Sequence, residues 1–196
     1  MKIYDISQEV FSCKVYPGDP KPEKQTLYST EAGDLYNLSS FAMCAHNGTH
    51  IDAPFHFVQN GKTVEQMDLS HFVGDCFVVR HEGEVTAVDA EDILRKANGA
   101  ERILVAGNAT VTAEAAEVFA TGGIKLLGNE GQTVGPENAP MQVHLILLRR
   151  GIALLEGVVL QGVPEGRYFL SAAPRSNLSH IRPMTLSRQW MRTSAV

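Results

Sequence analysis

The chain lacks a long apolar segment. None of its hydrophobic runs approaches the roughly 18 consecutive apolar residues that a membrane-spanning helix requires, and the run from Val143 to Leu148 ends at Arg149. The first residues, Met1 to Asp5, also lack the apolar core of a signal peptide. We therefore expect a cytoplasmic protein that has no membrane partner.

Cysteine and positive charge are scarce as well. The three cysteines, Cys13, Cys44 and Cys76, cannot all pair within the chain and form no CxxC motif, so we expect a reducing compartment and no disulfide framework. Lysine and arginine number 17 against 22 aspartates and glutamates, which gives a net charge of −5. A mildly acidic chain without a basic cluster is poorly suited to nucleic-acid phosphates, so no nucleic-acid partner is expected.

The composition is otherwise that of a globular protein. Hydrophobic residues make up 44% and charged residues 20% of the chain, which excludes a disordered chain, a collagen-like repeat and a coiled coil. A length of 196 residues is typical of one domain, so we expect residues 1–196 to form a single unit.

The order of apolar runs and turn signals predicts a mixed α/β domain built on a sheet. The first third is rich in turn-forming residues and short β-branched runs, and strands then alternate with helices. The predicted strands cover residues 72–80, 103–105, 124–127, 152–155, 168–172 and 181–185. The predicted helices cover residues 89–97, 113–120 and 138–150, with Asp89 and Thr112 as the N-caps of the first two.

Residues 46–57 (HNGTHIDAPFHF) hold the densest group of chemically active side chains. Three of the seven histidines and one aspartate fall between His46 and His56. His50 and Asp52 are two positions apart and share one face of a strand, which His46 joins if the strand continues. A proline at position 54 would end the ladder and turn His56 toward the others.

Imidazole and carboxylate groups on one face form a site suited to zinc or manganese. The alternative is a set of hydrogen-bonded core histidines, which is the usual role of a single buried histidine. Three histidines beside an aspartate, in a chain with few other histidines, favour the metal site.

This segment resembles the HxGTHxDxPxH motif of the cyclase-like metal-dependent hydrolases, the family of bacterial kynurenine formamidase and isatin hydrolase. The fixed positions all match: His46, Gly48, Thr49, His50, Asp52, Pro54 and His56. Further segments that resemble the family are Asp5-Ile6-Ser7, Tyr16-Pro17-Gly18-Asp19 and the pair His144 and Glu156. The resemblance implies a single domain with the swivelling β/β/α fold, in agreement with the mixed α/β pattern.

The resemblance also implies a metal centre. His46, His50 and Asp52 would bind one divalent ion, and Asp52 would bridge to a second ion held by His144 and Glu156. Zinc is the expected metal and manganese the alternative, with one or two ions per chain. Glu156 lies among apolar residues, where a carboxylate needs a partner, whereas His144 by its pattern alone would be an ordinary helix histidine.

For the substrate, the resemblance implies that His56 donates and accepts protons and that Tyr16 lines the pocket. Tyr16 could equally pack on the neighbouring prolines of its turn, and Glu130 is the alternative proton carrier. The other histidines, His71, His81 and His180, match no motif position, and we expect them to be structural or solvent-facing. The implied partners are a small-molecule substrate and further copies of the chain, as a homodimer or larger assembly.

The sequence departs from the family at the expected pocket. Tyr16 stands where the formamidases have tryptophan, residues 106–108 (AGN) replace Thr-Gly-Trp, and residues 128–130 (GNE) replace a GID segment. The loss of two indole rings weakens the case for a large aromatic substrate.

We therefore expect a metal-dependent hydrolase that uses a metal-activated water to cleave a C–N bond in a small amide, formamide or lactam, as an arylformamidase does. A metal-dependent lyase or cyclase acting on a small carbonyl compound is the first alternative. A non-catalytic protein that binds a small molecule or a metal is the second.

Overall fold

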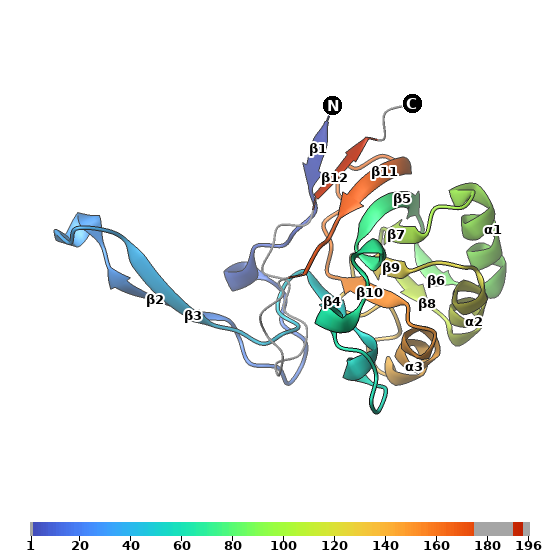
Figure 1. Ribbon diagram of the computed structural model, residues 1–196, viewed down its shortest axis with the longest axis horizontal. Coiled ribbons are helices and arrows are strands. Elements are labelled where there is room, and N and C mark those ends of the chain that lie inside the picture. The colour runs from blue at the N-terminus through green and yellow to red at the C-terminus, as the bar shows by residue number, and fades with distance from the viewer. Residues whose placement is uncertain (1, 175–189, 194–196) are drawn as a thin grey trace.

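The computed structural model describes residues 2–174 and 190–193. They form one curled eight-stranded sheet in the order β1-β12-β11-β5-β7-β9-β10-β4 (Figure 1). The strands of this sheet are β1 (Ile3–Asp5), β4 (His50–Asp52), β5 (Val73–Arg80), β7 (Arg102–Ala106), β9 (Leu126–Asn129), β10 (Ala153–Glu156), β11 (Gly166–Ser171) and β12 (Trp190–Thr193). The mixed α/β prediction is confirmed.

The middle of the sheet is parallel and its two sides are antiparallel. Strands β5, β7, β9 and β10 pair in parallel. On one side β11, β12 and β1 continue the sheet antiparallel, and on the other side β4 pairs antiparallel with β10. The parallel strands are joined through helices α1 (Ala87–Ala97), α2 (Ala113–Thr121) and α3 (Met141–Arg149), which lie together on one face (Figure 1).

Both faces of the parallel strands are buried. In β5, Phe77 and Val79 belong to the core beneath the helices, whereas Cys76 and Val78 belong to a second core on the opposite face. Alternate side chains of a strand point to opposite faces, so a strand covered on both sides is apolar at consecutive positions. This explains why residues 72–80 form a nearly continuous apolar run.

The first helix begins earlier than predicted. Thr86, not Asp89, is its N-cap: the Asp89 N–H donates to Thr86 Oγ1 at 3.3 Å, and the Thr86 N–H donates to Asp89 Oδ2 at 2.9 Å. This reciprocal capping box satisfies two backbone donors at once. Asp89 has a side chain of the kind that caps helices, but it is the third residue of this helix. The predicted cap of the second helix, Thr112, is confirmed.

Strand boundaries also shift where neighbouring strands set the register. The strand predicted at 124–127 is Leu126–Asn129, because Leu126 pairs with Arg102 on one side and Ala153 on the other. The strand predicted at 152–155 is likewise Ala153–Glu156, and the third helix starts at Met141, with Pro140 as its N-cap. The strand predicted at 181–185 lies outside the described residues.

A hairpin of β2 (Glu23–Tyr28) and β3 (Leu38–Ala42) projects from the body as an arm (Figure 1). Every residue of both strands is exposed. Another small sheet pairs β6 (Gly83–Val85) with β8 (Ala109–Val111) beside the helices.

The capping box of α1 makes a specific prediction for stability. We expect Thr86→Ala to lower the free energy of unfolding by about 0.5–2 kcal/mol, because it leaves a helix donor without its side-chain acceptor. Urea denaturation followed by circular dichroism measures the change. Val88→Ala, at a position of the same helix that is 74% exposed, is the control and should change stability little. Equal effects of the two substitutions would contradict the cap.

Candidate functional site

The pairing of β4 with β10 joins side chains from distant parts of the chain. The register sets His50 opposite Glu156 and Asp52 opposite Leu154. Residues directly opposite each other share a face of the sheet, and so do residues two apart on one strand. His50, Asp52 and Glu156 therefore project to the same side, as the spacing of the first two predicts.

Turns on either side of β4 bring in His46 and His56. Gly48 has a φ of +70°, in the left-handed region that favours glycine, so the chain turns before β4 and His46 does not extend the strand. After β4, Pro54 opens a short 3₁₀ helix, Pro54–His56, that carries the second histidine. The predicted turn at the proline is confirmed, and of the two possibilities for His46 the bend at Gly48 is the one observed.

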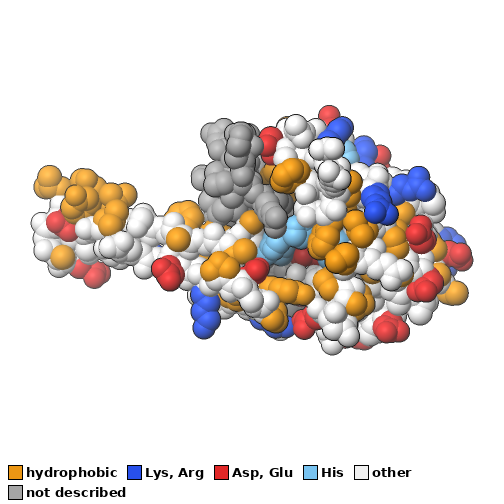
Figure 2. All heavy atoms as spheres, turned by 90° about the horizontal axis from the view of Figure 1, so that it is seen from below, with side chains coloured by type: hydrophobic (Ala, Val, Ile, Leu, Met, Phe, Trp, Pro, Cys, Tyr) orange, Lys and Arg blue, Asp and Glu red, His pale blue; other side chains and the backbone are white. Residues whose placement is uncertain are grey.

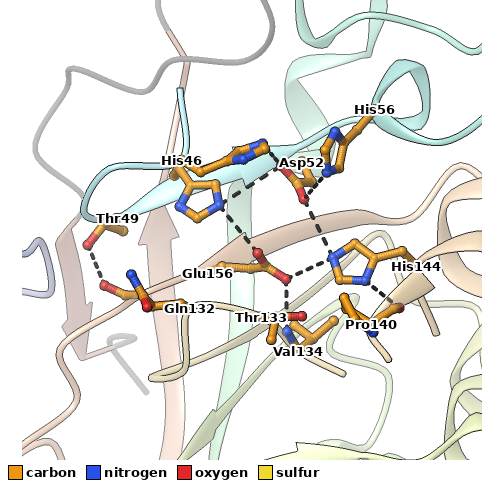
Figure 3. Close-up of polar contacts among 12 residues, drawn as sticks. His46, Thr49, Asp52, His56, Gln132, Thr133, Val134, Pro140, His144 and Glu156 are labelled. Carbon is orange, nitrogen blue, oxygen red and sulfur yellow. Dashed lines mark hydrogen bonds and ion pairs between the residues drawn. The ribbon is translucent and has the colours of Figure 1, made fainter. Parts of the chain in front are cut away.

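The Asp52 carboxylate lies at the centre of the cluster (Figure 3). Its Oδ1 is 3.4 Å from His46 Nε2 and 4.0 Å from His50 Nε2. Its Oδ2 is 3.5 Å from His56 Nε2 and 3.6 Å from His144 Nε2. Glu156 completes the cluster: Oε2 is 3.3 Å from His50 Nε2, and Oε1 is 3.2 Å from His144 Nε2. The structure thus brings together the side chains that the motif and the resemblance single out as ligands and proton carrier.

Backbone carbonyls fix the orientation of two of these rings. His50 Nδ1 lies 3.0 Å from the Gly48 carbonyl oxygen, and His144 Nδ1 lies 2.9 Å from that of Pro140. A carbonyl oxygen only accepts hydrogen bonds, so Nδ1 of each ring carries a proton and Nε2 is the nitrogen that faces the carboxylates. Metal-ligating histidines are held in this way.

The Glu156 carboxylate is held from behind by backbone. Its Oε1 accepts a hydrogen bond of 2.8 Å from the Val134 N–H, and the side chain is almost completely buried. The sequence-based expectation that this carboxylate needs a partner is therefore confirmed.

Burial and charge shift the protonation of the cluster in opposite directions. Burial by itself would raise the pKa of Asp52, but the imidazoles of His144 and His46 beside its carboxylate hold that pKa well below its usual range. Burial would lower the pKa of His50, but Glu156 and Asp52 outweigh it and raise that pKa to about 9. The same balance raises the pKa of His144 to about 10.

His56 differs from those two rings. Burial lowers its pKa, and the charges of His46 and His144 add to the effect against the opposing charge of Asp52. The ring is therefore neutral at neutral pH and can accept a proton. The His56 side chain is also more accessible to solvent than that of His144, since it is 13% exposed and His144 is 4% exposed.

The donor set fits a divalent ion. His46 Nε2 and Asp52 Oδ1 are buried and have no hydrogen-bond partner among the described residues. Such atoms are costly unless another group satisfies them, and nitrogen and oxygen donors suit zinc and manganese. Three groups of three ligand atoms lie within 4.8 Å of one another: His50-Asp52-Glu156, His46-Asp52-His56 and Asp19-Cys44-His46. Asp52 belongs to the first two, and the second group places His56 nearer to ligand geometry than the resemblance implies.

The cluster opens into a cavity of about 290 Å³. Its remaining walls come from six further residues: Tyr16, Asp19, Phe57, Gln132, Thr133 and Pro140. Tyr16 donates its O–H to the Glu137 carbonyl oxygen at 2.9 Å, so the tyrosine forms part of the cavity wall. Histidine side chains are visible in a hollow beside the base of the arm (Figure 2).

Two sequence-based expectations about the pocket need correction. Glu130 does not line the cavity formed by the described residues, and its two oxygens accept backbone hydrogen bonds from Gly107 at 2.7 Å and Leu160 at 2.8 Å. Residues 106–108, where the expected tryptophan is missing, do not line the cavity formed by the described residues. Both segments stabilise the loops behind the site.

Sequence reasoning missed several residues of the cavity wall. Asp19 stood in the quoted Tyr16-Pro17-Gly18-Asp19 segment without a role, and Phe57 directly follows the last motif histidine. Gln132 and Thr133 carried no motif at all. Of the three remaining histidines, His71 and His81 make local contacts with backbone carbonyls outside the cavity, and His180 lies outside the described residues.

Comparisons with known proteins define the class. The model of the cyclase family, described as "Putative cyclase", matches residues 4–136, and the chain belongs to this family. Kynurenine formamidase of Erythrobacter litoralis is 33% identical over 187 residues, covering 88% of this chain and 86% of the relative. Kynurenine formamidase of Salinibacter ruber is 32% identical over 191 residues, covering 89% and 90%.

Solved structures share the fold. A potential metal-dependent hydrolase with cyclase activity has a TM-score of 0.79 at 26% identity, over 97% of this chain and 96% of that one. Isatin hydrolase A from Labrenzia aggregata has a TM-score of 0.81 at 20% identity, over 97% and 93%, which shows the fold alone. Within the part of the chain that the structure describes, no helix is long and apolar enough to cross a membrane.

The central position of Asp52 predicts the result of its substitution. We expect Asp52→Asn to retain less zinc than His46→Ala, because Asp52 faces four rings and an amide carries no charge to offset that of an ion. Metal analysis after dialysis measures the difference. Asp92→Asn, on the exposed side of α1, is the control and should retain wild-type metal. Equal losses from Asp52→Asn and His46→Ala would contradict the central role.

Proposed function

We propose that this chain is a metal-dependent amidohydrolase that cleaves a C–N bond, other than a peptide bond, in a small amide, formamide or lactam. The observation that carries the proposal is the convergence of four imidazoles and two buried carboxylates on one cavity. The kynurenine formamidases that match most of the chain are arylformamidases, which supports the same reaction class.

We assign the metal ligands by position. His46, His50 and Asp52 would hold one zinc ion, and Asp52, His144 and Glu156 would hold a second, with manganese as the alternative metal. Divalent zinc bound there would polarise a carbonyl oxygen and activate water at neutral pH. The protein contributes ring orientation through the Gly48 and Pro140 carbonyls and a fixed Glu156 through the Val134 N–H.

His56 is the residue proposed to move the proton. It lines the cavity, its Nε2 is 3.5 Å from Asp52 Oδ2, and its Nδ1 is buried without a partner among the described residues. A neutral imidazole at the edge of the cluster can take a proton from water and return it to the departing nitrogen.

The cavity favours a compact substrate. Its volume of about 290 Å³ is at the lower end of the range for small-molecule sites, and Tyr16 and Phe57 supply its aromatic walls. A formanilide or a bicyclic lactam fits this description. Tyr16 is proposed to contact the ring of such a substrate.

A substrate panel tests the proposed reaction. Purified protein loaded with zinc or manganese is assayed on formanilides, lactams, lactones and small carbonyl compounds, with product identified by mass spectrometry. We expect addition of water across a C–N bond. Elimination or cyclisation without water uptake would establish the lyase, and metal binding without turnover of any compound would establish a binding protein.

The His56→Ala variant separates proton transfer from metal binding. We expect near-normal zinc content and a loss of about 100-fold or more in kcat on any amide found, because proton transfer contributes 10²–10⁴-fold. The loss should be smallest for an activated aryl ester, whose leaving group needs no proton. His71→Ala, outside the cavity, is the control. A variant that sheds its metal would make His56 a ligand, in line with its place in the His46-Asp52-His56 group.

We also propose that the chain forms a homodimer or larger assembly through the arm. An isolated two-stranded hairpin is marginally stable in water, and this one exposes large apolar side chains. Leu35 is 96% exposed, Tyr36 is 55% exposed and Phe41 is 51% exposed. The apolar tip of the arm is visible in Figure 2.

Light scattering coupled to size exclusion tests the assembly. We expect wild type to elute as a dimer or larger, and Leu35→Asp to weaken association by about tenfold or more, because burying one leucine contributes roughly 1.5–3 kcal/mol. Val88→Asp, exposed on α1, should leave the assembly unchanged. A monomeric wild type would contradict the proposal.

A further inference from the structure

The rings of the cluster are not supported alike from behind. His50 and His144 each place Nδ1 on a backbone carbonyl oxygen, a contact that requires no particular side chain at the acceptor. His46 has a carboxylate there instead. Its Nδ1 lies 3.7 Å from Asp19 Oδ2, while its Nε2 faces Asp52. The imidazole of His46 thus lies between two carboxylates, one on each side of the ring.

A tight turn delivers Asp19 to this position. The Asp19 N–H donates to the Tyr16 carbonyl oxygen at 3.0 Å, and Gly18 between them has a φ of +95°. Proline followed by such a glycine is the pattern of a type II turn, in which the glycine position disfavours other residues. The Pro17-Gly18 pair therefore fixes where the carboxylate of Asp19 points.

Hydrogen bonds join this turn to the segment that carries His46. The Asn47 side chain is 1% exposed and donates to the Pro20 carbonyl oxygen at 3.3 Å, while its Oδ1 accepts from the Cys44 N–H at 2.8 Å. The Cys44 thiol donates to Asp19 Oδ2 at 3.4 Å, so the same oxygen that faces His46 also accepts from the thiol. Two segments far apart in sequence are held at a constant separation.

We propose that Asp19 is a positioning residue that acts through His46. Its carboxylate faces the Nδ1 side of the His46 ring at ion-pair distance and thereby presents Nε2 to the metal beside Asp52. Carboxylate partners of this kind orient ligating histidines, and removing them typically costs 10–100-fold in metal affinity. Because Tyr16 begins the same turn, the orientation of a metal ligand is tied to a wall of the substrate cavity.

The inference rests on the proposed metal centre and is tested without turnover. Zinc affinity is measured by competition with a chromophoric chelator for wild type, Asp19→Asn and Cys44→Ala. We expect Asp19→Asn to bind zinc about 10–100-fold more weakly. We expect Cys44→Ala, which removes the thiol but keeps the carboxylate, to bind as wild type does. Circular dichroism checks that each metal-free variant is folded.

A second measurement reports on the ring itself. In the zinc-loaded protein, the Nδ1–H of His46 should give an exchange-protected imidazole proton signal in NMR, assigned by its absence in His46→Ala. We expect Asp19→Asn to lose this signal while the signals of His50 and His144, held by backbone carbonyls, remain. If the turn had only a structural role, Asp19→Asn would not remove the His46 signal while leaving the signals of His50 and His144 in place.

Several results would overturn the inference. The first is that Asp19→Asn leaves both the zinc affinity and the His46 proton signal unchanged. The second is that Cys44→Ala loses as much zinc affinity as Asp19→Asn, which would show that packing of the turn is responsible. A thiolate-to-cadmium charge-transfer band that Cys44→Ala lacks would make Asp19 and Cys44 ligands of a separate metal site. Failure of wild type to bind zinc would instead contradict the proposed function.

Discussion

Three residues of β4 pair with the end of β10, and this short ladder places Asp52 and Glu156 on one buried face of the sheet. Two carboxylates in such a position are strongly unfavourable unless positive charge and hydrogen bonds compensate them. The imidazoles of His50 and His144, whose pKa values are raised, and the Val134 N–H supply part of that compensation, and Asp52 Oδ1 is left without a hydrogen-bond partner among the described residues. The turn at Gly48 and the loop before α3 place these groups around the two carboxylates.

The parallel part of the sheet explains why the site lies where it does. Glu156 is the last residue of β10, and the loop after β9 supplies Gln132, Thr133 and the Val134 N–H. Ligands of open α/β sheets bind outside the carboxyl ends of the strands, where loops rather than ladders occupy the backbone. The antiparallel β4 is added at the sheet edge, so its polar residues face the same opening.

The N-terminal third contributes part of the cavity wall beside the proposed metal centre. Its turn contributes Tyr16 and Asp19 to the cavity, and its hairpin forms the exposed arm. The proposed metal ligands gather around Asp52, whereas Tyr16 and Asp19 form part of the wall beside them. The proposed reaction therefore rests on the cluster around Asp52, and the proposed substrate contact rests on the turn that carries Tyr16.

Local patterns determined much of the secondary structure. The apolar run at residues 72–80, the cap at Thr112 and the break at Pro54 all depend on neighbours in sequence, and the structure agrees with each. The start of α1 was misplaced because Thr86 and Asp89 both have capping side chains, and only the reciprocal hydrogen bonds distinguish the cap. The β9 boundary depends on pairing with remote strands.

The sequence by itself determined that His50 and Asp52 share a face, because strand alternation has a fixed period. It could not determine by its own pattern that His144 and Glu156 join them, since that depends on the packing of α3 and on the register of β10 with β4. Tertiary structure alone decided that Asp19 faces His46 and that both oxygens of Glu130 accept backbone hydrogen bonds. The physical reason is that each of these contacts joins segments more than twenty residues apart, whose separation no local propensity encodes.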